Sequence, residues 1–584
     1  MKRMRWVVLL AVFAIFVAAC GGDDDDDTTT TADAADTTAA PADTTAAPTE
    51  TTAATDTTGA TDTTVAGGDG MIVANEAGCA DDYAGKISSI EATGSHEVVF
   101  TLCSPDPAFL AKLAFVPFSI QPAEHLEATG GAPLENPIGT GPFVLENWAR
   151  GSEIVFSANA DYWGEPPSFS TLVFRWAEES TSRILELQSG TADFATNLAA
   201  SDYETVEADA NLQLLPDLNP NIFYVGFNNT FPPFDDVRVR QAIAMGIDRN
   251  RIVDTFYPTG SEVATHFTPC SIPNACEGED WYEFDPEAAQ ALLAEAGFPD
   301  GFDTTISLRD VFRVYLPEPQ VVAQEIQTQL AENLGINAEI SVQESGAFIE
   351  SANAGTLEGI HLLGWGADYP HVTNFLDFHF NGNIQFGESD PAIMEALTMG
   401  AAEVDEAAAA PIYENANNLI REFVPMVPIV WGAAADAALA SVGNAAVAPF
   451  GAPQFSKMDP GDDDFVFVQN AEPISLYCPD ESDGESLSAC EQVVESLYGY
   501  DVDGTVIPKL AESCDPNEDG TIWTCTLRQG VTFHDGSDFE SSDVIASWGA
   551  MMDANNPLHT GNAGLWVYPA YLWGSLINPP PPEG

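Results

Sequence analysis

Residues 21–70 of this 584-residue chain contain almost no side chain that could enter a hydrophobic core. The segment consists mainly of Thr, Ala, Asp, Pro and Gly, and it includes a run of aspartates from Asp23 to Asp27. Such a composition buries too little apolar surface to offset the entropy that is lost on ordering. We therefore expect a disordered tether here, followed by a folded part that is long enough for two or three domains.

The first twenty residues have the pattern of an export signal. A basic head precedes an apolar run from Trp6 to Val17, which is too short to span a bilayer comfortably. Val17-Ala18-Ala19-Cys20 resembles the bacterial lipobox, in which the cysteine is lipidated and becomes the new N-terminus. We expect residues 1–20 to be a lipoprotein signal peptide and Cys20 to carry the lipid. A plain signal peptide or a single membrane anchor is the alternative.

The charge of the chain excludes one class of partner. It has 18 Lys+Arg against 90 Asp+Glu, a formal net charge of −72. Such a field repels phosphate backbones and anionic lipid surfaces, so we expect no binding to nucleic acid. The negative charge is explained either by a need for solubility at high salt concentration or by attraction of cationic ligands.

Eight cysteines remain once Cys20 is set aside, and they occur close together in sequence. In the oxidising compartment that export implies, they indicate structural disulfides rather than a metal site, since no CxxC spacing occurs. Many connectivities are open, and we expect local pairing. The expected pairs are Cys79 with Cys103, Cys270 with Cys276, Cys478 with Cys490, and Cys514 with Cys525.

Short β-rich runs alternate with capped helical patterns, which indicates a mixed α/β fold. One helix is expected from Asp285 to Gly297, with Asp as its N-cap and Pro286 at its first position. A second is expected to carry Val322, Ile326, Leu330 and Leu334 and to end at Gly335. No GxxxxGK[ST], HExxH, GxSxG or helix-opening GxGxxG is present, so we expect no enzyme, no catalytic residue and no cofactor.

Six segments have the character of family motifs. They are Asn136–Phe143 (NPIGTGPF), Asn159–Gly164 (NADYWG), Leu187–Asp193 (LQSGTAD), Pro233–Arg249 (PFDDVRVRQAIAMGIDR), Asp285–Gly297 and Gly364–Pro370 (GWGADYP). Each motif alone is weak, but together they extend over most of the chain and are specific. They resemble motifs of the large solute-binding proteins that serve the peptide/nickel class of ABC importers, extracellular solute-binding protein family 5.

The order of the motifs departs from the family. Segments that resemble its beginning lie between Leu497 and Val544, and residues 71 onward resemble what normally follows them. No motif occurs twice, so we expect one circularly permuted copy rather than a truncated duplication. A permutation is tolerated where the old termini lie close together. It predicts that Val98–Leu102 and Thr521–Leu527 share a sheet.

The resemblance implies an α/β fold of the type II periplasmic-binding-protein class, in which two lobes enclose a cleft and an extra subdomain grows from the first lobe. Two strands that join the lobes would form a hinge, so that the cleft closes on the ligand. We expect a monomer. The implied parts are lobe I (134–223 and 433–492), lobe II (224–432) and the extra subdomain (71–133 and 493–584).

Asp368 is the leading ligand-binding candidate. In the peptide-binding members of the family, the acid of this motif pairs with the α-ammonium group of the peptide, and this sequence keeps an acid there. The alternative is an Asp that caps a turn or helix. Trp365 and Tyr369 would supply flat apolar walls, although Trp365 could equally be part of the core.

Three further candidates follow from the resemblance. Glu472 and Ser475 lie in a segment like the first strand of the family, to which a peptide could add by backbone hydrogen bonds. Asn228 lies near the expected hinge. Structural hydrogen bonding is the alternative for all three. The histidines at positions 361, 371 and 379 raise the nickel or haem binding known in the family, and His371 stands where the motif usually has Asp, but we expect no metal site.

The resemblance implies the substrate-binding component of an ABC importer, which captures short peptides by closure of its lobes. It would act with separate permease and ATPase subunits, anchored by its lipid to the outer face of the bacterial membrane, in the periplasm or at the cell surface. One alternative is the same scaffold holding a nickel complex, haem or another small solute. An alternative from a different class, a secreted hydrolase, lacks a recognisable nucleophile–base arrangement.

Overall fold

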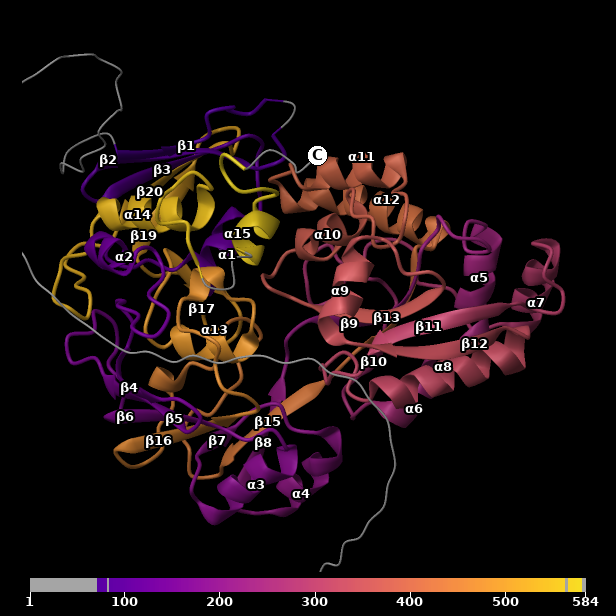
Figure 1. Ribbon diagram of the computed structural model, residues 1–584, viewed down its shortest axis with the longest axis horizontal. Coiled ribbons are helices and arrows are strands. Elements are labelled where there is room, and N and C mark those ends of the chain that lie inside the picture. The colour runs from indigo at the N-terminus through magenta and orange to yellow at the C-terminus, as the bar shows by residue number, and fades with distance from the viewer. Residues whose placement is uncertain (1–70, 81–82, 562–565, 580–584) are drawn as a thin grey trace, which may run out of the picture. The chain divides into compact units, whose positions relative to one another are not determined.

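The computed structural model describes residues 71–80, 83–561 and 566–579, which belong to one compact unit, Ala66–Gly584. The expected signal peptide, Cys20 and the tether lie outside the described residues. Among those described, no helix has both the length and the apolar character that a membrane span requires. The unit is a mixed α/β fold with three main sheets and a small hairpin (Figure 1).

The five-stranded sheet joins segments from opposite ends of the sequence, in the order β1-β2-β3-β20-β19. β3 and β20 are antiparallel, with Phe100 opposite Trp523. The prediction that Val98–Leu102 and Thr521–Leu527 share a sheet is therefore confirmed. α14 packs on this sheet, where the ring of Trp548 lies 5.1 Å from that of Phe100. The elements are β1 (Met71–Ala74), β2 (Ile87–Gly94), β3 (Glu97–Leu102), β19 (Ala511–Pro516), β20 (Ile522–Leu527), the hairpin β17 (Tyr498–Tyr500) and β18 (Val506–Pro508), α1 (Phe109–Ala114), η1 (Val116–Phe118), α2 (Ala123–Thr129), α14 (Ser541–Met552) and α15 (Val567–Leu572).

The seven-stranded sheet has the order β4-β5-β6-β16-β7-β15-β8 and again mixes distant segments. Its buried face is rich in phenylalanine, because Phe156, Phe174 and Phe467 alternate inward on neighbouring strands. The elements are β4 (Phe143–Ala149), β5 (Glu153–Ala158), β6 (Thr171–Trp176), β7 (Phe194–Ala195), β8 (Leu212–Asp217), β15 (Ala434–Leu439), β16 (Asp464–Gln469), α3 (Ser180–Ser189), η2 (Ala200–Asp202), α4 (Tyr203–Ala208), η4 (Phe455–Lys457), η5 (Cys478–Asp480) and α13 (Gly484–Cys490).

The six-stranded sheet has the order β10-β14-β9-β13-β11-β12, and α7 and α8 lie beside β11 and β12 (Figure 1). Both predicted helices are present: Asp285 caps α7 by accepting a hydrogen bond from the Ala288 N–H, and α8 ends at Gly335. The elements are β9 (Asn221–Phe227), β10 (Glu262–Val263), β11 (Asp303–Arg309), β12 (Asn337–Gln343), β13 (Ile360–Gly366), β14 (Met426–Trp431), α5 (Val237–Gly246), α6 (Arg249–Phe256), α7 (Pro286–Glu295), α8 (Pro319–Leu334), α9 (Ser345–Asn353), η3 (Val372–Asn374), α10 (Leu376–Phe380), α11 (Pro391–Gly400) and α12 (Glu406–Phe423).

Two short crossings connect the six- and seven-stranded sheets: residues 218–220 between β8 and β9, and residues 432–433 between β14 and β15. The buried Asn221 ties them together, because its amide donates to the Gly432 carbonyl at 2.7 Å and accepts from the Gly432 N–H at 2.9 Å. The apolar core of the six-stranded sheet is continuous with that of the five-stranded sheet, whereas the seven-stranded sheet has cores of its own. Separate cores linked by two crossings are what a hinged fold requires.

All four predicted disulfides are present: Cys79–Cys103, Cys270–Cys276, Cys478–Cys490 and Cys514–Cys525. Each closes a short stretch of chain within one part of the fold. None links the six-stranded sheet to the seven-stranded sheet, so these four bonds do not restrain the two crossings.

Candidate functional site

A cavity of about 350 Å³ lies beside the two crossings, and all three parts of the fold contribute to its walls. Asp217 and Asp436 enter it from the seven-stranded sheet, and Asp368 from the segment after β13. Val116 and Tyr568 enter it from the helices that accompany the five-stranded sheet. A cavity between separately packed sheets, with a few polar groups in its walls, is a common position for a small-molecule site.

Asp368 is the one predicted ligand residue that lines this cavity. The buried Asn374 of η3 holds it on both sides: its side-chain amide donates to the Asp368 carboxylate at 2.9 Å and accepts from the Asp368 N–H at 3.1 Å. Burial raises the pKa of Asp368 to about 6, against the opposing effect of hydrogen bonds from Asn374 and Tyr568. The carboxylate therefore has a fixed orientation and lacks a cationic partner within the described protein.

The two aromatic candidates near Asp368 pack against protein. The ring of Trp365 stacks on Phe378 at 4.5 Å, and its indole N–H donates to Asn374 at 3.2 Å. Tyr369 is buried, and its hydroxyl lies 3.2 Å from that of Thr373. Neither lines the cavity, and a ligand role for them stays a prediction.

The other three candidates also have protein partners. Glu472 accepts hydrogen bonds from the Trp148 indole and the Gly151 N–H, both at 3.1 Å. Ser475 is buried and donates to Glu481. Asn228 donates to the Gly355 carbonyl at 2.7 Å and accepts from the Thr230 hydroxyl at 2.6 Å. None of the three lines the cavity, and a ligand role for them stays a prediction.

The cavity contains carboxyl groups that the sequence analysis missed. Asp436 is 5% exposed and accepts from the Thr196 hydroxyl at 2.9 Å and the Asn197 N–H at 3.0 Å. Burial and the nearby Asp217 raise its pKa to about 8. One signal marked it in the sequence: it is the only charge within the alanine-rich strand Ala434–Leu439, where a polar residue without a partner is costly.

A second cavity, of about 760 Å³, adjoins the first and shares Val116, Ala452, Pro453 and Glu491 with it. One of its acids, Glu495, already has protein partners, because it accepts hydrogen bonds from the Tyr162 hydroxyl at 2.9 Å and the Trp163 indole at 2.7 Å. Because this larger space lies away from Asp368 and the crossings, we take the smaller cavity as the candidate ligand site.

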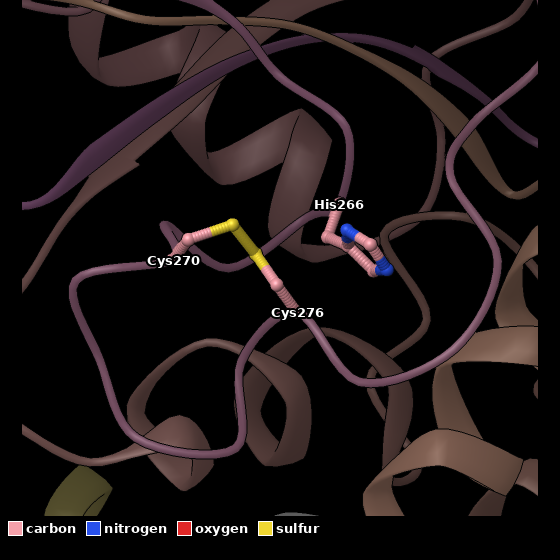
Figure 2. A group of neighbouring side chains, drawn as sticks. All are labelled: His266, Cys270 and Cys276. Carbon is pink, nitrogen blue, oxygen red and sulfur yellow. A yellow bond between two sulfur atoms is a disulfide. The ribbon is translucent and has the colours of Figure 1, made fainter.

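One group of side chains among the described residues has the spacing of a metal site: His266, Cys270 and Cys276, whose potential ligand atoms lie within 4.8 Å of one another (Figure 2). Figure 2 shows the two sulfurs bonded to each other as a disulfide, so neither is the thiolate that a metal needs. The three other histidines considered above form no such group among the described residues. His361 stacks on Phe386, His379 bonds the Phe375 carbonyl, and His371 caps η3.

Three comparisons place the chain among known proteins. A family model described as bacterial extracellular solute-binding proteins, family 5 (middle part), matches residues 26–386 and 505–565. Di/tripeptide-binding protein 3 of Pseudomonas aeruginosa is 31% identical over 377 residues, which is 62% of this chain and 70% of that protein. Heme-binding protein A of Haemophilus influenzae is 29% identical over 355 residues, 59% of this chain and 64% of that protein.

A solved structure agrees with these relatives. The dipeptide-binding protein of a Pseudoalteromonas species, in complex with Met-Leu, superposes with a TM-score of 0.57 at 28% identity and covers 64% of this chain and 75% of its own. Such likenesses confirm the predicted fold class, the type II fold of periplasmic binding proteins. They do not test the order of the segments along the chain.

Proposed function

Because this chain belongs to family 5 of the bacterial extracellular solute-binding proteins, we propose that it is the substrate-binding component of an ABC importer and captures short peptides. The observation that carries the proposal is the position of Asp368, an acid with no cationic partner among the described residues, in the cavity beside the two crossings. The ammonium group of a peptide would supply the missing charge as water leaves. Relatives named as dipeptide- and di/tripeptide-binding proteins favour a peptide over other solutes.

The mechanism needs no chemistry on the ligand. Closure about residues 218–220 and 432–433 would bring the Asp368 wall and the Asp436 wall together around the peptide. Asn221 would couple the movement of the two crossings, because its side chain makes two hydrogen bonds to Gly432. The family consists of binding proteins, and we assign no catalytic residue.

The proposal includes the cellular setting. Residues 1–20 would direct export, Cys20 would carry the lipid on the outer face of the membrane, and residues 21–70 would tether the folded unit. The monomeric binding protein would deliver its ligand to a membrane permease driven by ATPase subunits. Support comes from the lipobox-like sequence and from a family described as extracellular.

Titration calorimetry of the purified protein with dipeptides and tripeptides tests the proposed function. We expect saturable binding of peptides with a free amino terminus and at least about 100-fold weaker binding of their N-acetyl forms, because acetylation removes the charge that Asp368 would meet. Binding of haem or of a nickel–histidine complex, with no response to any peptide, would assign the scaffold to another solute.

We also propose that the chain is a circular permutation of the family order. The pairing of β3 with β20 supports it, as does the contact between the segment after α15 and the segment after β1. The Asn578 amide donates to the Ala74 carbonyl at 3.0 Å and accepts from the Glu76 N–H at 2.9 Å. A connection from residue 578 to β1 would therefore need little additional chain.

Restoring the family order should leave the fold intact. In the variant, residue 578 is joined to Met71 by a short Gly-Ser linker, and the chain is opened between Gly461 and Asp462, in the exposed turn before β16. We expect an unchanged circular dichroism spectrum and unchanged peptide affinity. A control opened inside β16, between Val466 and Phe467, should not fold, because that strand lies between β6 and β7. Failure of both chains would contradict the permutation.

A further inference from the structure

The charged groups of the candidate site have one sign. Five carboxyl groups line the cavity, and no Lys, Arg or His is present among its described lining residues. Burial raises the pKa of every one of the five: to about 6 at Asp368, to about 7 at Glu485 and Glu491, to about 8 at Asp436, and also at Asp217. Ionised acids in such a space are costly until a cation arrives.

The cations nearest to this cavity already have partners. The guanidinium of Arg183, behind Asp436, donates to four backbone carbonyls, those of residues 177, 178, 196 and 197. In the adjoining cavity Lys457 pairs with Asp501 at 2.5 Å, and Lys509 pairs with Glu495 at 3.4 Å. All three cations are therefore engaged with protein, and none of them lines this cavity.

Neutral side-chain donors in the cavity wall are also engaged with protein. The side-chain amide of Asn219 donates to two carbonyls, those of Ala367 and Pro449, and the amide of Gln469 donates to that of Ala471. By contrast, the buried Ser488 hydroxyl has no hydrogen-bond partner within the described protein and lines the cavity. It can accept from a ligand N–H group as readily as it can donate.

The acids also lie on two different walls. Asp368 follows β13, whereas Asp217 and Asp436 stand on the paired strands β8 and β15, where Asp217 is opposite Ala434 and Asp436 is opposite Leu215. Asp217 disfavours the charge of Asp436, whereas no neighbouring charge contributes to the shift at Asp368. Among the five carboxyl groups, Asp368 and the Asp217–Asp436 pair are thus separate anionic points, each of which can hold one cation.

We propose that the cavity selects short peptides with a second cationic group, an inference that rests on the proposed function. The amino terminus of the peptide meets Asp368, and a Lys or Arg side chain meets Asp217 and Asp436. The C-terminal carboxylate finds no cationic partner among the described lining residues and lies toward the opening. A peptide with an acidic side chain would bring a further negative charge into an anionic space, which the site rejects.

Calorimetry with Ala-Ala, Ala-Lys, Ala-Glu and the C-terminal amide of Ala-Lys tests the inference. We expect Ala-Lys to bind at least about tenfold more tightly than Ala-Ala, Ala-Glu to bind more weakly than both, and the amide to bind no more weakly than the free acid. Equal affinity for Ala-Ala and Ala-Lys, or loss of binding on amidation, would overturn the charge selection and leave peptide capture standing.

The matched variants are Asp436→Asn and Glu332→Gln, which replace one carboxyl group by an amide inside the cavity and at an exposed position of α8. Asn at position 436 can still accept the bonds from Thr196 and Asn197. Asp436→Asn should reduce the advantage of Ala-Lys over Ala-Ala to less than about threefold, while Glu332→Gln leaves that advantage unchanged. The same loss in both variants would overturn the inference, because it would reflect net charge alone.

A diamine separates failure of the inference from failure of the proposed function. If no peptide binds but putrescine does, and Asp436→Asn weakens it, the cavity selects dications and the peptide assignment is wrong. If neither peptides nor putrescine bind, both proposals fall.

Discussion

Asp368→Asn should weaken the binding of peptides with a free amino terminus by at least about 100-fold and leave the melting temperature nearly unchanged. The substitution keeps the shape of the side chain and its contact with Asn374, but it removes the negative charge. An ammonium group that leaves water for a half-buried site then meets a neutral amide, and most of the interaction is lost. Calorimetry of both proteins with the same dipeptide measures the effect.

The N-acetyl form of that dipeptide is the control. It lacks the ammonium group, so wild type and Asp368→Asn should bind it equally weakly, which assigns the loss to this one pair of charges. Binding by the wild type should also weaken below about pH 6, as Asp368 takes up its proton and loses its charge. A variant that keeps full affinity for the free dipeptide removes Asp368 from the ligand site.

Much of the fold could be predicted because its signals are local or lie in long motifs. The Asp285–Pro286 start and the Gly335 end define helices by capping alone, and the alternation of Trp523, Cys525 and Leu527 defines a half-buried strand. The cysteine pairs were predictable for the same reason, since each joins residues close in sequence.

The site was less predictable, because its walls meet only in three dimensions. Asp368 could be found because it belongs to the GWGADYP motif. Asp436 and Glu491 carry no comparable motif, and their roles depend on which strand end or helix end faces the cavity. Trp365 and Tyr369 belong to the same motif, yet the Trp365 ring stacks on Phe378 and the Tyr369 hydroxyl lies beside that of Thr373. A residue's neighbours in sequence do not determine which wall it forms.

The ion pair between Lys112 and Asp106 stabilises the wall that carries Val116. Both side chains are about 1% exposed, and the ammonium lies 2.6 Å from the carboxylate. Burial alone would raise the pKa of Asp106, but the facing ammonium groups of Lys112 and Lys86 lower it to about 2. Lys112→Met should therefore reduce the free energy of unfolding by about 3 kcal/mol, because the one ion pair that remains to the buried carboxylate among the described residues is the longer contact with Lys86, at 3.9 Å. Urea unfolding at pH 7 measures the loss.

Two controls separate this buried pair from ordinary surface charge. Lys457→Met breaks the exposed pair with Asp501 and should cost about 1 kcal/mol or less. Adding Asp106→Asn to Lys112→Met should recover part of the loss, because the amide oxygen still accepts from the Ala108 N–H.

The pH dependence of the free energy of unfolding should follow the pKa of Asp106. In the wild type the depressed pKa stabilises the fold above about pH 4, and that contribution is lost as the pH falls through about 2. In Lys112→Met the pKa of Asp106 rises, so its native state takes up a proton at higher pH and the deficit should narrow between pH 7 and about pH 3. A deficit that stays constant over that range, or equal losses in Lys112→Met and Lys457→Met, would show that the buried pair does not hold this wall.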